Sequence, residues 1–429
     1  MPHLKDERTQ LVAVIALALV ARLMFIAFLA APVDLDGGDA WWYLAYGAAL
    51  ARVDEPAPVP AGPGYLLFAG IIANLFPEPV VIPLIQLAQA ALGALTVGLA
   101  YGIGRRLWSP RAGLIAGTAL AISPAFVVET ANVATETLFI FLLLGALALY
   151  TQRAGAGRSR ALAVVGIILG LATLTRAVLL AFPAALALHL AMTRGWRRAV
   201  RPAAAMLLAF ALTLAPWTAY NLARWNRFVV AADGFVSFLW LGTQEEGWQG
   251  PEASDAALGV TADDPENRDY TGKAAEAIRA DPAGYAALRL RNLAEAFAQP
   301  HNTAYFHGES LKEAAARWLA EDRSLSGLAV LARIEAFWPK LALYVFHYTG
   351  VIMGLAGMVI QMRRPGGGRA AGALYALVAY FLAVHLVLYV IPRYLFPLEA
   401  IWWLFAAFTC SQAWDALAAR RARRTLIPS

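Results

Sequence analysis

The chain has 429 residues, of which 60% are hydrophobic and only 15% are charged. Soluble domains carry about 25% charged residues, so this composition excludes an ordinary soluble protein and predicts a lipid-facing surface. The net charge of +6 does not indicate a nucleic-acid binder, because the basic residues form short clusters between apolar runs, as in membrane loops. The single cysteine, Cys410, excludes an intramolecular disulfide.

Ten apolar segments are long enough, or nearly so, to cross about 30 Å of hydrocarbon as helices. We expect transmembrane helices at residues 11–32, 80–104, 111–128, 136–151, 161–176, 178–193, 202–220, 339–361, 370–391 and 394–416. The first is interpreted as a retained helix, because it is longer than the apolar region of a signal peptide. Arg176 and Pro183 interrupt one long apolar region, which is therefore divided into a helical hairpin over residues 161–193.

The basic clusters between these segments predict the orientation of the chain in the membrane. With ten helices, every cluster falls on the same side, and the short loops on the other side are nearly free of lysine and arginine. The clusters are Lys5 and Arg8, Arg105 to Arg111, Arg153 to Arg160, Arg194 to Arg201, Arg363 to Arg369, and Arg420 to Arg424. We therefore expect both termini in the cytoplasm.

Two long segments then face outward and define three parts of the chain. Residues 1–220 are an N-terminal transmembrane module with a first outer loop at 33–79, where an aromatic stretch from Trp41 and an apolar stretch from Gly64 predict interfacial helices. Residues 221–338 form an outer segment with amphipathic helices that break at Asp281-Pro282. Residues 339–429 hold the last helices and the basic tail. The predicted fold class is an all-α polytopic membrane protein.

Three acidic residues, Asp34, Asp36 and Asp39, lie within six positions at the outer end of the first helix. They are interpreted either as solvated loop carboxylates or as a catalytic base or metal site at the membrane surface. Asp34-Leu35-Asp36 also matches the D-x-D signature of soluble glycosyltransferases, but that motif requires a cytoplasmic strand–loop context that this chain lacks.

Seven segments resemble the GT-C glycosyltransferases, which include bacterial relatives of protein O-mannosyltransferases and the aminoarabinose transferases of lipid A. They are Asp39–Tyr43, Pro63–Phe68, Thr135–Phe139, Leu174–Arg176, Pro216–Asn221, Ala275–Phe297 and Arg393–Glu399. Their order and spacing extend over nearly the whole chain. Ala61 and Gly62 stand where the aminoarabinose transferases carry a basic residue. The resemblance implies a GT-C-like bundle of about ten transmembrane helices.

The resemblance places the catalytic base at Asp39, since a carboxylate can accept the proton of an attacking hydroxyl group. Asp36 is the main rival and Asp34 the third candidate. Glu136 is interpreted either as a helix-start carboxylate, favoured by the helix dipole, or as a second acidic site residue. Arg176 and Arg393 lie at outer helix ends against the positive-inside bias, so they are candidates for binding the phosphate of the donor lipid.

Other polar residues receive weaker functional interpretations. Glu129, in the outer loop between the third and fourth helices, is expected to be exposed. His301 and His307 are expected to be ordinary loop histidines, because their spacing does not fit metal coordination on one helical face. Arg22 in the first helix has no partner that the sequence can name. No cofactor is required, although a divalent metal could bind through Asp34, Asp36 or Glu136.

The expected function is an inverting transfer of a sugar from a polyprenyl-phosphate-linked donor to a hydroxyl group of a glycan, lipid or protein. The reaction would take place at the outer, periplasmic face of a bacterial cytoplasmic membrane, where nucleotide-sugars are not available and the donor must be tethered to the membrane. A transporter or flippase is the alternative, although the chain lacks the repeats typical of transporters. A ligase that moves whole oligosaccharides also remains open.

Overall fold

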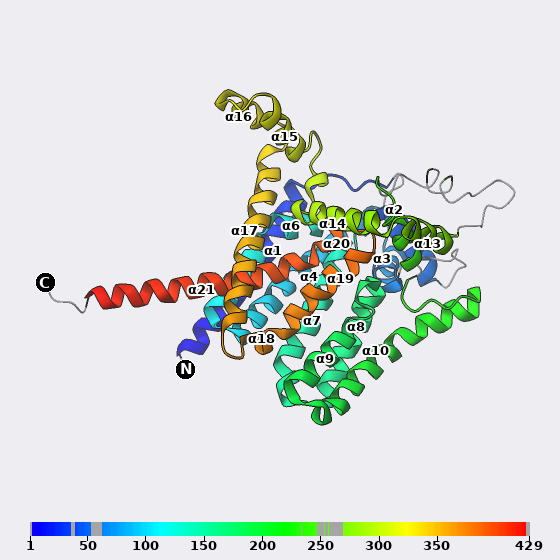
Figure 1. Ribbon diagram of the computed structural model, residues 1–429, viewed down its shortest axis with the longest axis horizontal. Helices are drawn as coiled ribbons and strands as arrows, with labels where there is room; N and C mark the ends of the chain where they lie inside the picture. The colour runs from blue at the N-terminus through cyan, green and yellow to red at the C-terminus, as the bar shows by residue number, and fades with distance from the viewer. Residues whose placement is uncertain are drawn as a thin grey trace.

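The computed structural model describes residues 2–35, 39–52, 62–232, 234–246, 253, 256 and 269–425. All regular elements in this part of the chain are helical, and Figure 1 shows how they are arranged. The long helices are α1 (Pro2–Phe28), α4 (Glu78–Leu107), α7 (Glu136–Arg153), α8 (Ser159–Thr175), α9 (Phe182–Arg194), α10 (Trp196–Trp225), α17 (Phe337–Arg363), α19 (Gly372–Val387) and α21 (Pro397–Thr425).

The shorter elements connect or flank these helices. They are α2 (Asp39–Ala51), α3 (Pro63–Leu75), α5 (Pro110–Ile122), α6 (Pro124–Val128), α11 (Phe235–Leu241), α13 (Tyr270–Ala280), α14 (Pro282–Ala298), α15 (Leu311–Glu321), α16 (Leu325–Leu331), α18 (Gly367–Ala370) and α20 (Pro392–Leu395). Four 3₁₀ turns complete the described elements: η1 (Glu129–Ala131), η2 (Ala154–Ala156), η3 (Ala177–Leu179) and η4 (Thr303–Tyr305).

Each of the ten predicted spans coincides with a helix or with two consecutive helices, which confirms the predicted fold class. Among the described residues, six helices are long and apolar enough to cross a membrane on their own, and α5 with α6 adds a seventh if the pair is one span. The helices α8 and α19 are apolar but shorter. Helix α21 provides much of the core, because every residue from Leu398 to Phe408 is buried.

The third predicted span, residues 111–128, is bent rather than straight. Helix α5 ends at Ile122 and α6 begins at Pro124, with an angle of 56° between α5 and the segment 124–131. Pro124 has no backbone N–H and restricts the residue before it, so the helix breaks there. Arg22, which is 1% exposed, donates hydrogen bonds to the carbonyl oxygens of Leu120 and Ala121, both at 3.3 Å. The sequence could not name this partner.

Ion pairs bring the predicted cytoplasmic ends of α1, α4, α5 and α21 together at one end of the bundle. Arg105, at the end of α4, forms an ion pair of 2.7 Å with Glu7 near the start of α1. Arg111, at the start of α5, pairs with Asp415 near the end of α21. In Figure 1 the N-terminal end of α1 and the C-terminal end of α21 both lie on the left, away from α2 and α13. The predicted common side of these clusters therefore corresponds to a common end of the structure.

The predicted interfacial helices of the first outer loop are α2 and α3, which pack closely on each other. Gly47 of α2 and Gly70 of α3 form the contact, because a Cβ atom at Gly70 would overlap the carbonyl oxygen of Gly47. The start of α3 also packs on the end of α8, where a Cβ atom at Gly62 would overlap the carbonyl oxygen of Leu174. These contacts hold the loop against the residues around Arg176.

The predicted amphipathic helices of the outer segment are α13 and α14, and the helix breaks where predicted. Asp281 is the N-cap of α14, and its Oδ1 accepts a hydrogen bond of 2.8 Å from the backbone N–H of Gly284. Pro282 occupies the first helical position, where no backbone donor is needed. Helix α14 packs against α19 and α20 and thereby places residues 299–306 beside the bundle.

Candidate functional site

The centre of the candidate site is Glu136, the first residue of α7, which is fully buried. Its Oε1 accepts hydrogen bonds from Arg176 Nη1 and Arg393 Nε, and its Oε2 accepts one of 3.1 Å from Arg393 Nη2. Burying a carboxylate is costly unless it is paired and hydrogen-bonded, and two arginines satisfy both requirements here. Glu136 is therefore anchored from two directions.

The two arginines reach Glu136 from the junctions between long helices. Arg176 follows α8 in an extended conformation and also donates a 3.2 Å hydrogen bond to Thr135 Oγ1. Its guanidinium group lies over the ring of Tyr394, 5.4 Å from the ring centroid. Arg393 lies in the short α20, which Pro392 begins. Both side chains are thus positioned by breaks between helices.

Asp39 completes a row of four charged side chains, Arg176, Glu136, Arg393 and Asp39, which we call the quartet. It is the first residue of α2, and its Oδ2 accepts a hydrogen bond from Arg393 Nη1. Its side chain is 59% exposed, whereas Glu136 is fully enclosed. The order Arg176, Glu136, Arg393, Asp39 alternates in sign, and the two positive and two negative charges sum to zero. One carboxylate of this quartet is structural and buried, and the other faces outward.

Burial and neighbouring charges set the ionisation of the groups around Arg393. Burial alone would lower the pKa of Arg393, but the carboxylates of Glu136 and Asp39 outweigh it and hold that pKa well above its usual value. Burial raises the pKa of Tyr43, on α2, to about 12, despite the nearby positive charge of Arg393. Arg393 therefore keeps its charge, and Tyr43 keeps its phenolic proton, throughout the physiological pH range.

Four of the six site residues named from the sequence thus come together, although they lie up to 354 positions apart. Asp39, Glu136, Arg176 and Arg393 form the quartet. Asp34 lies exposed on the segment after α1. Asp36 lies outside the described residues.

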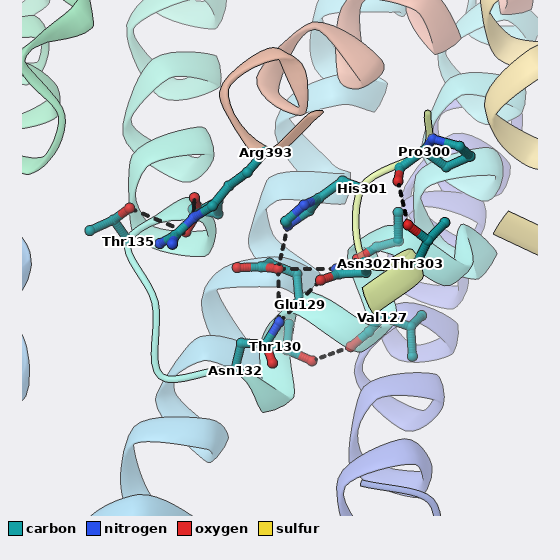
Figure 2. Close-up of polar contacts among 12 residues, drawn as sticks. Val127, Glu129, Thr130, Asn132, Thr135, Pro300, His301, Asn302, Thr303 and Arg393 are labelled. Atoms are coloured by element: carbon teal, nitrogen blue, oxygen red, sulfur yellow. Dashed lines mark hydrogen bonds and ion pairs between the residues drawn. The ribbon is translucent and has the colours of Figure 1, made fainter. Parts of the chain in front are cut away.

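A second polar cluster beside the quartet was not anticipated. Glu129 was expected to be exposed, and this expectation is wrong, because the residue is 2% exposed. Its Oε2 accepts hydrogen bonds from His301 Nε2 at 2.8 Å, Asn302 Nδ2 at 3.0 Å and Asn132 Nδ2 at 3.1 Å. Figure 2 shows these side chains converging on Glu129, with His301 on the side of Arg393. The outer segment after α14 covers this loop and removes Glu129 from solvent.

Gln89 of α4 and Tyr65 of α3 hold the turn that carries Glu129. Gln89 Nε2 donates to the carbonyl oxygens of Thr130 at 3.1 Å and Asn132 at 2.6 Å, and Gln89 Oε1 accepts a 2.7 Å bond from the hydroxyl group of Tyr65. Glutamines in a membrane helix are a signal that sequence reasoning could have used, since a buried polar group needs partners. The location of those partners was not evident from the sequence.

The described residues contain no group of three or more histidine, cysteine, aspartate or glutamate side chains that could hold a metal ion. Both oxygens of Glu136 are occupied by arginine donors. Asp36, one of the three predicted metal ligands, lies outside the described residues, and we assign no step to a metal.

Comparison with known proteins finds one family model that matches part of the N-terminal module. Residues 57–220 match the model of the dolichyl-phosphate-mannose-protein mannosyltransferase family. This match includes Glu136 and Arg176 and ends within α10. No curated protein sequence matches the chain.

The fold matches solved structures of membrane glycosyltransferases. The oligosaccharyltransferase AglB of Archaeoglobus fulgidus, in complex with an inhibitory peptide and a dolichol-phosphate, is 14% identical with a TM-score of 0.55, and the match covers 98% of this chain and 52% of that chain. A complex of the Archaeoglobus fulgidus oligosaccharyltransferase with Zn and sulfate is 15% identical, with a TM-score of 0.54 and coverages of 96% and 50%. ArnT of Cupriavidus metallidurans, bound to undecaprenyl phosphate, is 17% identical with a TM-score of 0.42, and the match covers 93% of this chain and 76% of that chain.

The chain spans about half the length of the archaeal enzyme. At these identities, the likeness to the archaeal enzyme concerns the fold. The predicted resemblance is nevertheless confirmed: residues 57–220 match a family of GT-C mannosyltransferases, and the chain has the fold of the GT-C glycosyltransferases.

Proposed function

We propose that this protein is an inverting glycosyltransferase that moves a sugar from a polyprenyl-phosphate-linked donor to a hydroxyl group at the outer face of a cytoplasmic membrane. The observation that carries the proposal is Arg393, which contacts the exposed carboxylate of Asp39 and the buried carboxylate of Glu136 at once. A candidate base and a candidate phosphate ligand are thereby joined in one unit.

Asp39 is proposed as the general base. One of its oxygens is bonded to Arg393, and more than half of the side chain is accessible, so an acceptor hydroxyl group can approach it. The hydroxyl oxygen attacks the anomeric carbon while its proton passes to Asp39, and the phosphate leaves from the opposite face of the sugar. Such proton transfer by a positioned carboxylate contributes about 10²- to 10⁴-fold to the rate.

Arg393 and Arg176 are proposed to stabilise the leaving phosphate. In the resting quartet their charges are balanced by Glu136 and Asp39. When Asp39 takes the proton it becomes neutral, and the quartet acquires one net positive charge. That charge develops at the moment when the bond to the phosphate breaks, which is when stabilisation of negative charge lowers the barrier most.

The proposed donor class is argued from the predicted face of the site. The basic loops gather at the opposite end of the bundle from α2 and are predicted to be cytoplasmic. A site on the outer face has no access to cytoplasmic nucleotide-sugars and requires a membrane-tethered donor. The ligands named for the similar structures, dolichol-phosphate and undecaprenyl phosphate, agree with this class. The acceptor is a hydroxyl group of a glycan, lipid or protein.

The test uses purified protein in vesicles with a polyprenyl-phosphate donor that carries a radiolabelled sugar, and a membrane extract as the source of acceptors. We expect the label to become covalently attached to an acceptor, with inverted anomeric configuration and release of polyprenyl phosphate. Label that only crosses the vesicle membrane on its original lipid would instead identify a transporter and contradict the proposal.

A further inference from the structure

The second polar cluster, defined as Glu129, His301, Asn302 and Asn132, is organised around the carboxylate of Glu129. Three donors converge on one oxygen of Glu129, Oε2. Asn302 also donates to the carbonyl oxygen of Ala125 at 3.1 Å, and Asn132 donates to Asn302 Oδ1 at 3.1 Å. The carboxylate is thus fixed in one orientation, and the imidazole ring that it holds is fixed with it.

The ring of His301 has one nitrogen bound and one nitrogen available. Because the partner of Nε2 is a carboxylate that accepts two other hydrogen bonds, Nε2 must carry the proton. The ring packs on Phe396, with centroids 4.6 Å apart and an angle of 41° between the planes. Among the described residues, Nδ1 has no hydrogen-bond partner. A histidine that a carboxylate orients through one nitrogen can transfer a proton through the other.

Charged groups from four elements surround this ring. Glu129 comes from η1, Glu136 from α7 and Arg393 from α20, and the ring is near enough to Glu136 for their charges to interact. Figure 2 shows His301 and Arg393 as neighbours. Glu399 of α21 lies one turn from Phe396, and its Oε1 accepts from Ser123 at 3.5 Å. His301 therefore borders the quartet at Glu136 and Arg393.

A small cavity beside Glu129 connects the second polar cluster with Arg22 of α1. The two residues line the same small cavity of about 10 Å³, together with Thr96, Thr130 and Thr137. Such a volume is about that of one water probe. Arg22 Nε is buried and has no partner among the described residues. A buried arginine in a membrane helix needs an anionic partner, and Glu129 is the carboxylate that lines its cavity.

We propose that His301, oriented by Glu129, is a second proton-transferring residue of the site and acts as the general acid for the leaving phosphate. The proposal rests on the proposed glycosyl transfer. The acceptor O–H bond breaks and its proton goes to Asp39, while the acceptor oxygen forms a bond to the anomeric carbon. His301 enters this step protonated at both ring nitrogens. The bond from that carbon to the phosphate oxygen breaks, its electron pair stays on that oxygen, and the oxygen takes the Nδ1 proton, which leaves a neutral ring whose Nε2–H is still bonded to Glu129. Exchange with water restores both residues.

The experiment compares His301→Gln and Glu129→Gln with His307→Gln, a matched control on the exposed histidine of the same segment. Sugar transfer is measured from pH 5 to pH 9, with kcat and the KM for the donor determined separately. A general acid must be protonated, so we expect wild-type kcat to fall toward the alkaline end of this range. We expect His301→Gln to lower kcat by about 10²-fold and to abolish the decrease of kcat at alkaline pH, with little change in KM for the donor.

If the wild-type protein transfers sugar and His301→Gln keeps both the wild-type kcat and its decrease at alkaline pH, the inference is overturned. Absence of transfer by the wild-type protein would instead refute the proposed function. Nitrogen NMR of histidine-labelled wild-type protein provides a readout that does not depend on variant folding. Addition of polyprenyl phosphate is expected to change the Nδ1 signal of His301 to that of a protonated nitrogen, and an unchanged signal contradicts the proposal.

Discussion

Arg393 holds Glu136 with two nitrogens, Nε on one carboxylate oxygen and Nη2 on the other at 3.1 Å. A planar guanidinium group makes this two-point contact with fixed geometry, whereas a lysine ammonium group cannot. The third donor, Nη1, remains free to reach Asp39. One side chain thereby fixes the distance between the enclosed and the exposed carboxylates.

Replacement of Arg393 by lysine is therefore expected to reduce activity although the charge is kept. Lysine would contact one carboxylate and lose the other, so Asp39 would no longer be held beside Glu136. We expect Arg393→Lys to lower kcat/KM by about 10- to 100-fold, which corresponds to roughly 1.4–2.7 kcal/mol. Arg111→Lys, at the exposed pair with Asp415, is the control and should retain activity. Equal activities of the two variants would show that the two-point contact is dispensable.

Removal of the charge at Glu136 is expected to affect stability rather than activity alone. Glu136→Gln leaves two arginines at a buried position without their shared carboxylate. Loss of one partner of a buried ion pair typically costs about 3–5 kcal/mol. Thermal unfolding in detergent should show a marked decrease in Tm, whereas Glu276→Gln on the exposed face of α13 should show almost none. Similar Tm values for both variants would contradict the structural role of Glu136.

The contact between α2 and α3 predicts an indirect effect on Asp39. Gly70→Ala places a methyl group against the carbonyl oxygen of Gly47 and must push α2 away from α3. Overpacking of this kind costs about 1–3 kcal/mol. Because α2 begins at Asp39, its displacement should also lower kcat. The control is Gly102→Ala on α4, where a Cβ atom meets no other atom within 4 Å. If Gly70→Ala transfers sugar as fast as Gly102→Ala, the helix contact does not position Asp39.

Hydropathy and sidedness predicted most of the fold, because both depend on local composition. The break between α8 and α9 and the helix start at Pro282 were marked by single residues whose backbone chemistry is decisive. The bend before Pro124 was not predicted, because the residues on both sides of it are apolar and hydropathy alone does not reveal a break in the helix. The helices α15 and α16 were also missed, because a short amphipathic helix in a polar segment resembles a loop in sequence.

The quartet could be predicted only as far as charge and resemblance identified its members. Arg176 and Arg393 were recognised because arginine at an outer helix end is unusual. Their shared pairing with Glu136 depends on tertiary packing and could not be inferred from positions 217 residues apart. Glu129 was misinterpreted for the same reason: it looks like an exposed loop residue until the segment after α14, which carries His301, covers the turn at η1.

The most direct measurement of the central claim is sugar transfer by Asp39→Asn with a polyprenyl-phosphate-linked donor. The substitution removes the proton-accepting charge but keeps the shape of the side chain. We predict that the variant binds polyprenyl phosphate as the wild type does, and that kcat falls by about 10²- to 10⁴-fold. Asp415→Asn, at an exposed aspartate that is also paired with an arginine, should transfer sugar at the wild-type rate. Wild-type turnover by Asp39→Asn would contradict the account.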